Sequence, residues 1–123
     1  MERVYIISRY RAKTARERRF NERVARYFCR RITEAGAQPV APHLFYTQFI
    51  DDNDPEDRRR GLRFGLEDLK LADSFLLVII DGQISEGMAG ELTELSRGHG
   101  PQRGHMISLT RKEAEKRLRA VGL

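Results

Sequence analysis

The chain has 123 residues, 40% of them hydrophobic and 33% charged, which is the composition of a globular protein rather than a disordered one. This length favours one domain, spanning residues 1–123 and built around a single core. The formal net charge is +5, but acidic residues are interleaved with the arginines. We therefore interpret the basic segments as solvated helix faces, and no motif indicates a sequence-specific DNA-binding protein.

Cysteine and histidine usage excludes several kinds of site. Cys29 is alone, so there is no disulfide framework and no cysteine-based metal site. The histidines, His43, His99 and His105, are scattered without the spacing of metal ligands. The apolar run near the N-terminus is too short for a signal peptide or a membrane span. We expect a cytoplasmic protein with no metal, no cofactor and no membrane partner.

The first part of the chain alternates strand and helix signals. Residues 3–8 (RVYIIS) are β-branched and apolar, which is typical of a fully buried strand. Residues 16–35 predict an amphipathic helix, because their apolar positions fall on one stripe, and Gly36 follows where a glycine commonly ends a helix. Residues 37–42 (AQPVAP) predict a short second strand whose two prolines limit its pairing on one side.

A long aromatic connection follows at residues 43–54 (HLFYTQFIDDND). Connecting segments seldom expose this much apolar surface, so we expect it either to pack on a partner subunit or to line a pocket. His43 to Phe49 have no obvious cover in so small a domain. We therefore predict a homo-oligomer, most simply a homodimer.

The second part continues the alternation. The continuous apolar run SFLLVII is the best strand signal in the chain and fits a central parallel strand. Asp54, Ser85 and Thr110 each have a residue type that caps helix N-termini. In chain order we predict a helix within 53–73, a strand over 74–80, a helix from Ser85 to Ser96, a strand over 105–109 and a helix after Thr110.

This β-α-β-α-β-α-β-α order predicts an α/β domain with a doubly wound parallel sheet and helices on both faces. Such sheets bind ligands outside the carboxyl ends of their strands, at a topological switch point. Two loops occupy that place, SRYRAKT at residues 8–14 and DGQISEGM at residues 81–88. The candidate site is therefore expected between them.

The second of these loops brings several chemical groups together. Ser85 can cap the next helix and present a hydroxyl, and Gly87 lets a ligand approach the backbone closely. The free N–H groups of the first helical turn favour an anion such as a phosphate. Glu91, on the second turn, is a carboxylate that can attack an anomeric carbon. The simpler interpretation is a plain helix cap and an exposed Glu91, with Glu94 facing solvent.

Three segments carry a resemblance: RVYIIS-Y-R near the start, PVAPHLFYTQFIDDNDPEDRRRGLRFG in the middle and ISEGMAGEL later. They resemble a phage and bacterial family of small domains, without an agreed function, that is described as nucleoside 2-deoxyribosyltransferase-like. The resemblance runs from about Arg3 to Ile107. More distantly, the chain is similar to deoxyribosyltransferases and nucleotide N-glycosidases, so the resemblance implies a flavodoxin-like (Rossmann-like) fold.

The resemblance also implies residue roles. Those enzymes use a Glu nucleophile spaced Gly-x-x-x-Glu from a loop glycine, as Gly87 and Glu91 are here. A tyrosine near the end of the first strand orients that Glu, and Tyr5 matches it. In the N-glycosidase branch a serine six residues before the Glu contacts a 5′-phosphate, and Ser85 matches it, where the transferases have Asp. This favours a nucleotide over a free nucleoside. We therefore predict Glu91 and Tyr5 as catalytic residues and, as substrate or phosphate contacts, Ser8, Arg9, Arg11, His43, Asp81, Ser85, Gly87 and Met88.

Two departures from the enzymes matter. Gly65 stands where they carry an Asp that acts on the leaving base, so that acid is missing from its expected place. Glu67, Asp68 and His43 are candidates to replace it. His43 lies near the strand ends, where it can donate to a phosphate or protonate a base, or can be a hydrogen-bonded loop residue. Arg9 stands where relatives more often have Pro, and adds positive charge.

Three functions follow as hypotheses. The first is a hydrolase or (deoxy)ribosyltransferase acting on the N-glycosidic bond of a nucleotide or nucleoside through a Glu nucleophile. The second is a module that binds or sequesters a nucleotide without turnover, which the missing acid favours. The third is a nucleic-acid-binding domain, which only the net charge supports.

Overall fold

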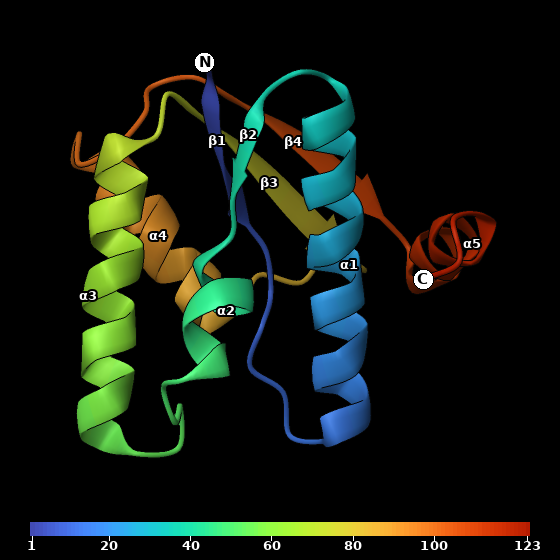
Figure 1. Ribbon diagram of the computed structural model, residues 1–123, viewed down its shortest axis with the longest axis horizontal. Coiled ribbons are helices and arrows are strands. Elements are labelled where there is room, and N and C mark those ends of the chain that lie inside the picture. Colours follow the sequence, from blue (N-terminus) through green and yellow to red (C-terminus); the bar gives the residue numbers. More distant parts are fainter.

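Four parallel strands form the centre of the molecule in a computed structural model that describes residues 1–123. In spatial order they are β2 (Gln38–Val40), β1 (Arg3–Ile7), β3 (Ser74–Ile80) and β4 (Gly104–Leu109). The strands β1 and β3 pair with each other at the middle of the sheet, and Figure 1 labels all four strands. The predicted parallel α/β sheet is confirmed, and it agrees with a flavodoxin-like fold. The switch point lies between β1 and β3, because the chain leaves β1 towards β2 on one side and returns to β3 on the other.

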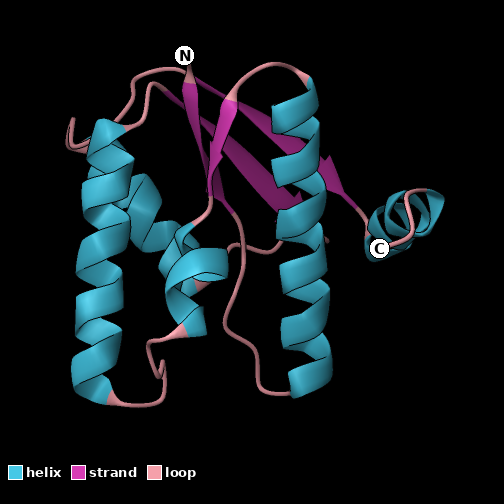
Figure 2. Cartoon of the chain, in the orientation of Figure 1, coloured by secondary structure: helices cyan, strands magenta, loops and turns pink.

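Helices cover both faces of this sheet (Figure 2). The helix α1 (Ala15–Glu34) and the helix α5 (Arg111–Ala120) share one apolar core with the strands. The helix α3 (Pro55–Leu71) and the helix α4 (Glu86–Ser96) contribute to a second core on the opposite face. Successive strand residues point to opposite faces, so Ile6 joins the α1/α5 core while its neighbour Tyr5 joins the α3/α4 core.

The predicted caps explain where three helices begin. The side chain of Asp54 accepts from the Asp57 backbone N–H, with Pro55 at the first helical position of α3. Ser85 caps α4 in the same way, and Thr110 forms a reciprocal capping box at the start of α5.

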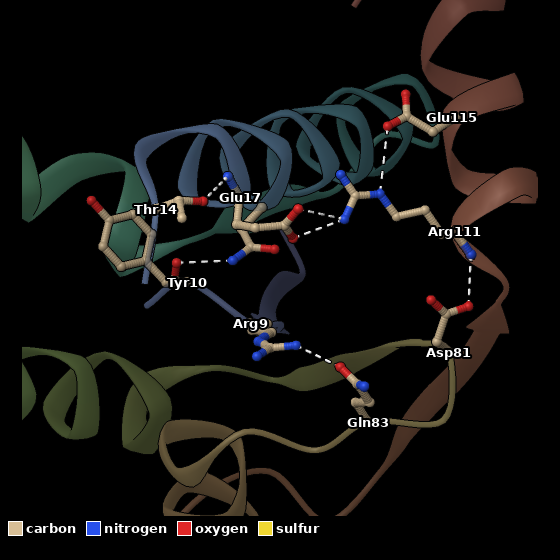
Figure 3. Close-up of polar contacts among 9 residues, drawn as sticks. Arg9, Tyr10, Thr14, Glu17, Asp81, Gln83, Arg111 and Glu115 are labelled. Atoms are coloured by element: carbon tan, nitrogen blue, oxygen red, sulfur yellow. Dashed lines mark hydrogen bonds and ion pairs between the residues drawn. The ribbon is translucent and has the colours of Figure 1, made fainter. Parts of the chain in front are cut away.

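A partly exposed ion pair joins the two helices on one face of the sheet. Arg111 Nη1, at the start of α5, donates to both carboxylate oxygens of Glu17 on α1, at 2.9 and 2.8 Å (Figure 3). The same guanidinium lies 3.8 Å above the centre of the Phe20 ring. These contacts hold α5 against α1 through charge and cation–π attraction as well as apolar packing.

The aromatic connection is more ordered than a loop. It contains the short helix α2 (Pro42–Phe45) and the 3-10 helix η1 (Tyr46–Gln48). The predicted second strand is correspondingly shorter and ends at Val40, because Pro42 begins α2, where a proline at the first helical position loses no hydrogen bond. One side of the connection contacts α3, while Phe45 and Phe49 stay 59% and 64% exposed. No helix is long and apolar enough to cross a membrane.

Candidate functional site

A cavity of about 790 Å³ opens beside the carboxyl ends of β1 and β3. Its wall is formed by the loop after β1, by α2 and η1, by one side of α3 and by the first half of α4. The aromatic connection therefore lines a pocket, which is one of the two places expected for it. The cavity lies at the switch point, where the parallel topology predicts a ligand.

Glu91 and Tyr5 meet inside this cavity. Tyr5 is 2% exposed because β1 is covered on both faces, and Glu91 is half-buried on the second turn of α4. Burial raises the pKa of Glu91 from its ordinary 4.5 to about 7, and a hydrogen bond from the Tyr5 hydroxyl offsets part of that rise. Burial, and then the charge of Glu91, raise the pKa of Tyr5 well above its usual range, so this hydroxyl keeps its proton and donates.

The start of α4 forms the cavity wall next to Glu91. Ser85 Oγ accepts from the Met88 backbone N–H at 3.2 Å, which leaves the hydroxyl proton free to donate. A side chain at Gly87 would meet no atom within 4 Å, so the space above this glycine is open to a ligand. Glu86, beside them, also lines the cavity. A phosphate at this helix end would therefore have the carboxyl groups of Glu86 and Glu91 nearby as well as N–H donors.

Three arginines line the same cavity. Arg9 Nη1 donates to Gln83 Oε1 at 2.6 Å and so joins the loop after β1 to the loop after β3 (Figure 3). Arg11 Nε and Arg58 Nη1 both pair with Asp52, at 3.3 and 3.2 Å. Asp52 thus aligns two guanidinium groups at one side of the cavity, where an anion would find several charged donors.

His43 is held by a neighbouring ring. Its imidazole stacks on Tyr10, with ring centres 5.1 Å apart and planes 15° from parallel. Burial lowers the pKa of His43, the charge of Asp52 raises it and that of Arg58 lowers it further. The ring is therefore neutral at pH 7 and acts as a hydrogen-bond donor or acceptor rather than as a cation. The pair also presents a flat aromatic wall to the cavity.

Gly65 leaves room beside Tyr5 and Glu91. A side chain at this position would point toward the Tyr5 hydroxyl, with its Cβ 3.5 Å from that oxygen. Of the possible replacements for the missing acid, Glu67 is exposed and pairs with Lys70 at 3.3 Å, outside the cavity. Asp68 accepts a hydrogen bond from the Tyr46 hydroxyl at 2.9 Å, and Tyr46 does line the cavity.

Most of the predicted site residues come together. Nine of the ten line the cavity, namely Tyr5, Ser8, Arg9, Arg11, His43, Ser85, Gly87, Met88 and Glu91. Asp81 does not. Its carboxylate turns away and accepts from the Arg111 backbone N–H at 2.8 Å, at the start of α5 (Figure 3). Glu94, expected in solvent, lies at the cavity wall and pairs with His99 at 2.7 Å.

Several lining residues lie outside the prediction, chiefly Tyr10, Tyr46, Thr47, Asp52 and Arg58. The aromatic character of the connection was a usable signal for Tyr46 and Thr47. Nothing in the sequence distinguishes Arg58 from the neighbouring arginines of α3, because only the helix orientation selects it. No group of three or more His, Cys, Asp or Glu side chains is arranged to hold a metal ion.

Residues 2–103 match the family described as "Domain of unknown function (DUF7768)". The chain belongs to the DUF7768 family. This match includes every cavity residue and leaves β4 and α5 outside it. No curated protein matches the chain in sequence.

Chains of solved structures share the fold of this DUF7768 protein. One is a 2-deoxyribosyltransferase from the psychrotolerant bacterium Bacillus psychrosaccharolyticus, which superposes with a TM-score of 0.59 at 20% sequence identity. The alignment covers 86% of this chain and 72% of that one. At this identity the similarity establishes a common α/β fold.

Proposed function

We propose that this protein cleaves the N-glycosidic bond of a nucleotide or nucleoside, as a hydrolase or as a (deoxy)ribosyltransferase, with Glu91 as the nucleophile. The observation that carries the proposal is the Glu91 carboxylate inside a cavity at the switch point, held by the Tyr5 hydroxyl and with a pKa of about 7. A buried carboxylate is costly, and such groups are concentrated in functional sites. The fold shared with a 2-deoxyribosyltransferase supports the same chemistry.

The reaction follows from the placement of these groups. Ionised Glu91 attacks the anomeric carbon, the bond to the base breaks, and the base leaves with the electron pair and takes up a proton. A covalent glycosyl–enzyme intermediate remains. Water, losing a proton, or a second base then attacks the anomeric carbon and frees Glu91. Tyr5 stabilises the carboxylate before attack by its hydrogen bond.

Two groups are placed to hydrogen-bond to the leaving base in the absence of an acid at residue 65, and the proton that the base takes up comes from solvent. His43 lines the cavity and is neutral at pH 7, so it can donate its ring N–H. Tyr46 lines the cavity too, with its hydroxyl bound to Asp68. Either group supplies a polar contact to a base lying near Gly65.

The cavity supports a nucleotide more than a free nucleoside as the substrate. Arg9, Arg11 and Arg58 bring three cationic side chains into it, and the capped start of α4 adds the Ser85 hydroxyl and backbone N–H groups. A free nucleoside has no anionic group for these charges to bind. No cofactor enters the reaction.

A second candidate function is nucleotide binding without turnover. Gly65 favours it, because residue 65 supplies no second carboxylic acid, besides Glu91, to protonate the leaving base. The cavity, the arginines and the aromatic wall would serve a binding module equally well.

The test is to incubate the protein with a panel of (deoxy)nucleotides and nucleosides and to measure free base by chromatography. Glu91→Gln keeps the size and much of the hydrogen bonding but removes the nucleophile. We expect base release to fall by orders of magnitude while nucleotide affinity changes little, because the lost interaction belongs to the transition state.

Glu67→Gln is the matched control, since it makes the same chemical change on an exposed part of α3 outside the cavity. Turnover that survives Glu91→Gln would show that another group is the nucleophile. A wild-type protein that binds a nucleotide, seen as a thermal shift, but never releases base would identify the binding module instead.

A further inference from the structure

A second cavity, of about 480 Å³, adjoins the first. The two share six lining residues in the loop after β1 and the aromatic connection, and the second extends beyond them to the start of α1. The residues that only the second cavity has are Ala12, Lys13, Arg18, Asp51 and Asn53. A ligand seated at Glu91 can therefore continue past Arg9 and Arg11 into this space.

The charge changes sign from one end of the combined cavity to the other. The first cavity has four acidic side chains, Asp52, Glu86, Glu91 and Glu94, against three basic ones, Arg9, Arg11 and Arg58. The second cavity has four basic side chains, Arg9, Arg11, Lys13 and Arg18, against two acidic ones, Asp51 and Asp52. Lys13 and Arg18 form no ion pair within the chain, so their charges are free for a ligand. An elongated ligand that is neutral at one end and strongly anionic at the other matches this distribution.

The walls of the second cavity are held in place before any ligand arrives. The Tyr10 carbonyl accepts from Asn21 Nδ2 at 3.0 Å, and Asn21 is buried on α1. The Tyr10 ring stacks on His43, and Arg11 pairs with Asp52 at 3.3 Å. The loop after β1 is thereby fixed to both α1 and the aromatic connection. Binding a ligand therefore costs less conformational entropy than it would with a mobile loop.

We propose that the second cavity binds the outer phosphates of a nucleoside di- or triphosphate whose sugar lies at Glu91. This inference rests on the proposed function of the first cavity. We expect a nucleoside monophosphate to occupy the first cavity alone, because Lys13 and Arg18 line only the second cavity. Each further phosphate adds negative charge and acceptor oxygens, which the four basic side chains can bind as charge-assisted contacts. The substrate class is thus a nucleotide with a phosphate chain.

Binding measurements test this without depending on turnover. The protein is titrated by calorimetry, at constant ionic strength and with and without Mg²⁺, with inorganic phosphate, inorganic tripolyphosphate and deoxynucleoside mono- and triphosphates. We expect tripolyphosphate and triphosphates to bind more tightly than phosphate and monophosphates. Lys13→Ala combined with Arg18→Ala should weaken triphosphate binding by roughly tenfold or more and monophosphate binding by less than about twofold.

The matched control combines Arg16→Ala with Arg19→Ala, which removes the same charge from exposed positions of α1 that line neither cavity. Equal losses in both double variants would mean general electrostatic attraction and would overturn the proposal. Equal affinity for mono- and triphosphates would also overturn it, as would binding of a single-stranded oligonucleotide in preference to every triphosphate. If the protein releases base from monophosphates only and shows no preference for binding triphosphates, the proposed N-glycosidic cleavage stands and the proposed role of the second cavity is overturned.

Discussion

Glu91 is the residue at which stability and proposed function conflict. Burial holds its pKa at about 7, and the Tyr5 hydrogen bond only partly offsets that effect. No cation is among the groups that act on its pKa. The folded protein must therefore accept a half-buried, poorly compensated charge whenever Glu91 is ionised. Such a charge is tolerated where chemistry requires a reactive carboxylate.

The pH dependence of stability follows from the same shift. The unfolded chain ionises Glu91 near 4.5, and the folded protein ionises it near 7. Between these values the folded state binds more protons than the unfolded state. The contribution of Glu91 to the free energy of unfolding therefore falls as pH rises from 4.5 to 7, and above pH 7 it no longer changes. Solvent in the cavity reduces the effect, and we expect about 1–3 kcal/mol at pH 8.

Glu91→Gln should remove this pH-dependent loss. We compare the free energies of unfolding of the variant and the wild type by urea unfolding at pH 5 and pH 8. The difference, variant minus wild type, should be about 1–3 kcal/mol larger at pH 8 than at pH 5. Glu67→Gln, on the exposed side of α3, should show no such gain. A Glu91→Gln variant whose stability relative to wild type is the same at both pH values would mean that Glu91 is not desolvated in the folded protein.

At the scale of elements, the start of α4 both stabilises the helix and lines the cavity. Ser85 ends the loop after β3 and stabilises the helix by accepting from Met88 N–H, and the same hydroxyl faces the cavity. Thr110 caps α5 equally directly but lies outside both cavities. The two caps therefore allow helix stability to be separated from ligand binding.

Ser85→Ala and Thr110→Ala should each lower the free energy of unfolding by about 1 kcal/mol, since each loses one N-cap. Only Ser85→Ala should also weaken nucleotide binding, by about 1–3 kcal/mol, because a hydrogen bond to a charged phosphate is lost. Its effect on a nucleoside should be smaller. Thermal unfolding and calorimetric titration measure both quantities. A Ser85→Ala variant with unchanged nucleotide affinity would assign Ser85 to helix capping alone.

The aromatic connection shows how tertiary contacts stabilise elements that are too short to be stable alone. The helix α2 has only four residues, fewer than an isolated helix needs. Tyr46, the residue that follows α2, anchors it to α3: its hydroxyl donates to Asp68, and the centroids of the Tyr46 and Phe64 rings are 5.0 Å apart. This explains why local patterns predicted a connection there rather than a helix.

At the scale of the whole molecule, an aromatic surface remains uncovered beside the cavity. The Phe45 and Phe49 rings pack edge-to-face, 5.5 Å apart, and are 59% and 64% exposed. We propose that a second copy of the chain covers them, as predicted for a homodimer or a larger homo-oligomer. The same connection forms the cavity wall through His43, Tyr46 and Thr47. Association would thus stabilise the cavity wall from outside.

Light scattering at tens of micromolar should show a dimer, because an interface of standard size holds at that concentration. Phe45→Ser combined with Phe49→Ser should give a monomer. Met106→Ser, on the 65% exposed Met106 of β4, is the control and should leave the dimer intact. A monomeric wild-type protein, or a double variant that still dimerises, would contradict this assignment of the aromatic surface.

The amino-acid pattern predicts the four strands, the four longer helices and their order along the chain, though not the short helices α2 and η1. Continuous apolar strands such as 74–80, alternating with capped amphipathic helices, admit few arrangements other than a parallel sheet covered on both faces. Parallel topology then brings the carboxyl ends of β1 and β3 together, so the meeting of Tyr5 with Glu91 could be predicted from their positions in the chain and the resemblance.

Which side chains complete the cavity, and how they behave, depends on contacts that form only in the folded chain. Asp81 lies in the predicted loop, yet a positive φ of 52° and the start of α5 turn its carboxylate away. Arg58 and Asp52 line the cavity because α3 and the aromatic connection face the loop after β1. The pKa of Glu91 likewise depends on what surrounds it. Burial, side-chain direction and charge pairing are properties of surroundings assembled from distant segments, so no local pattern in the chain encodes them.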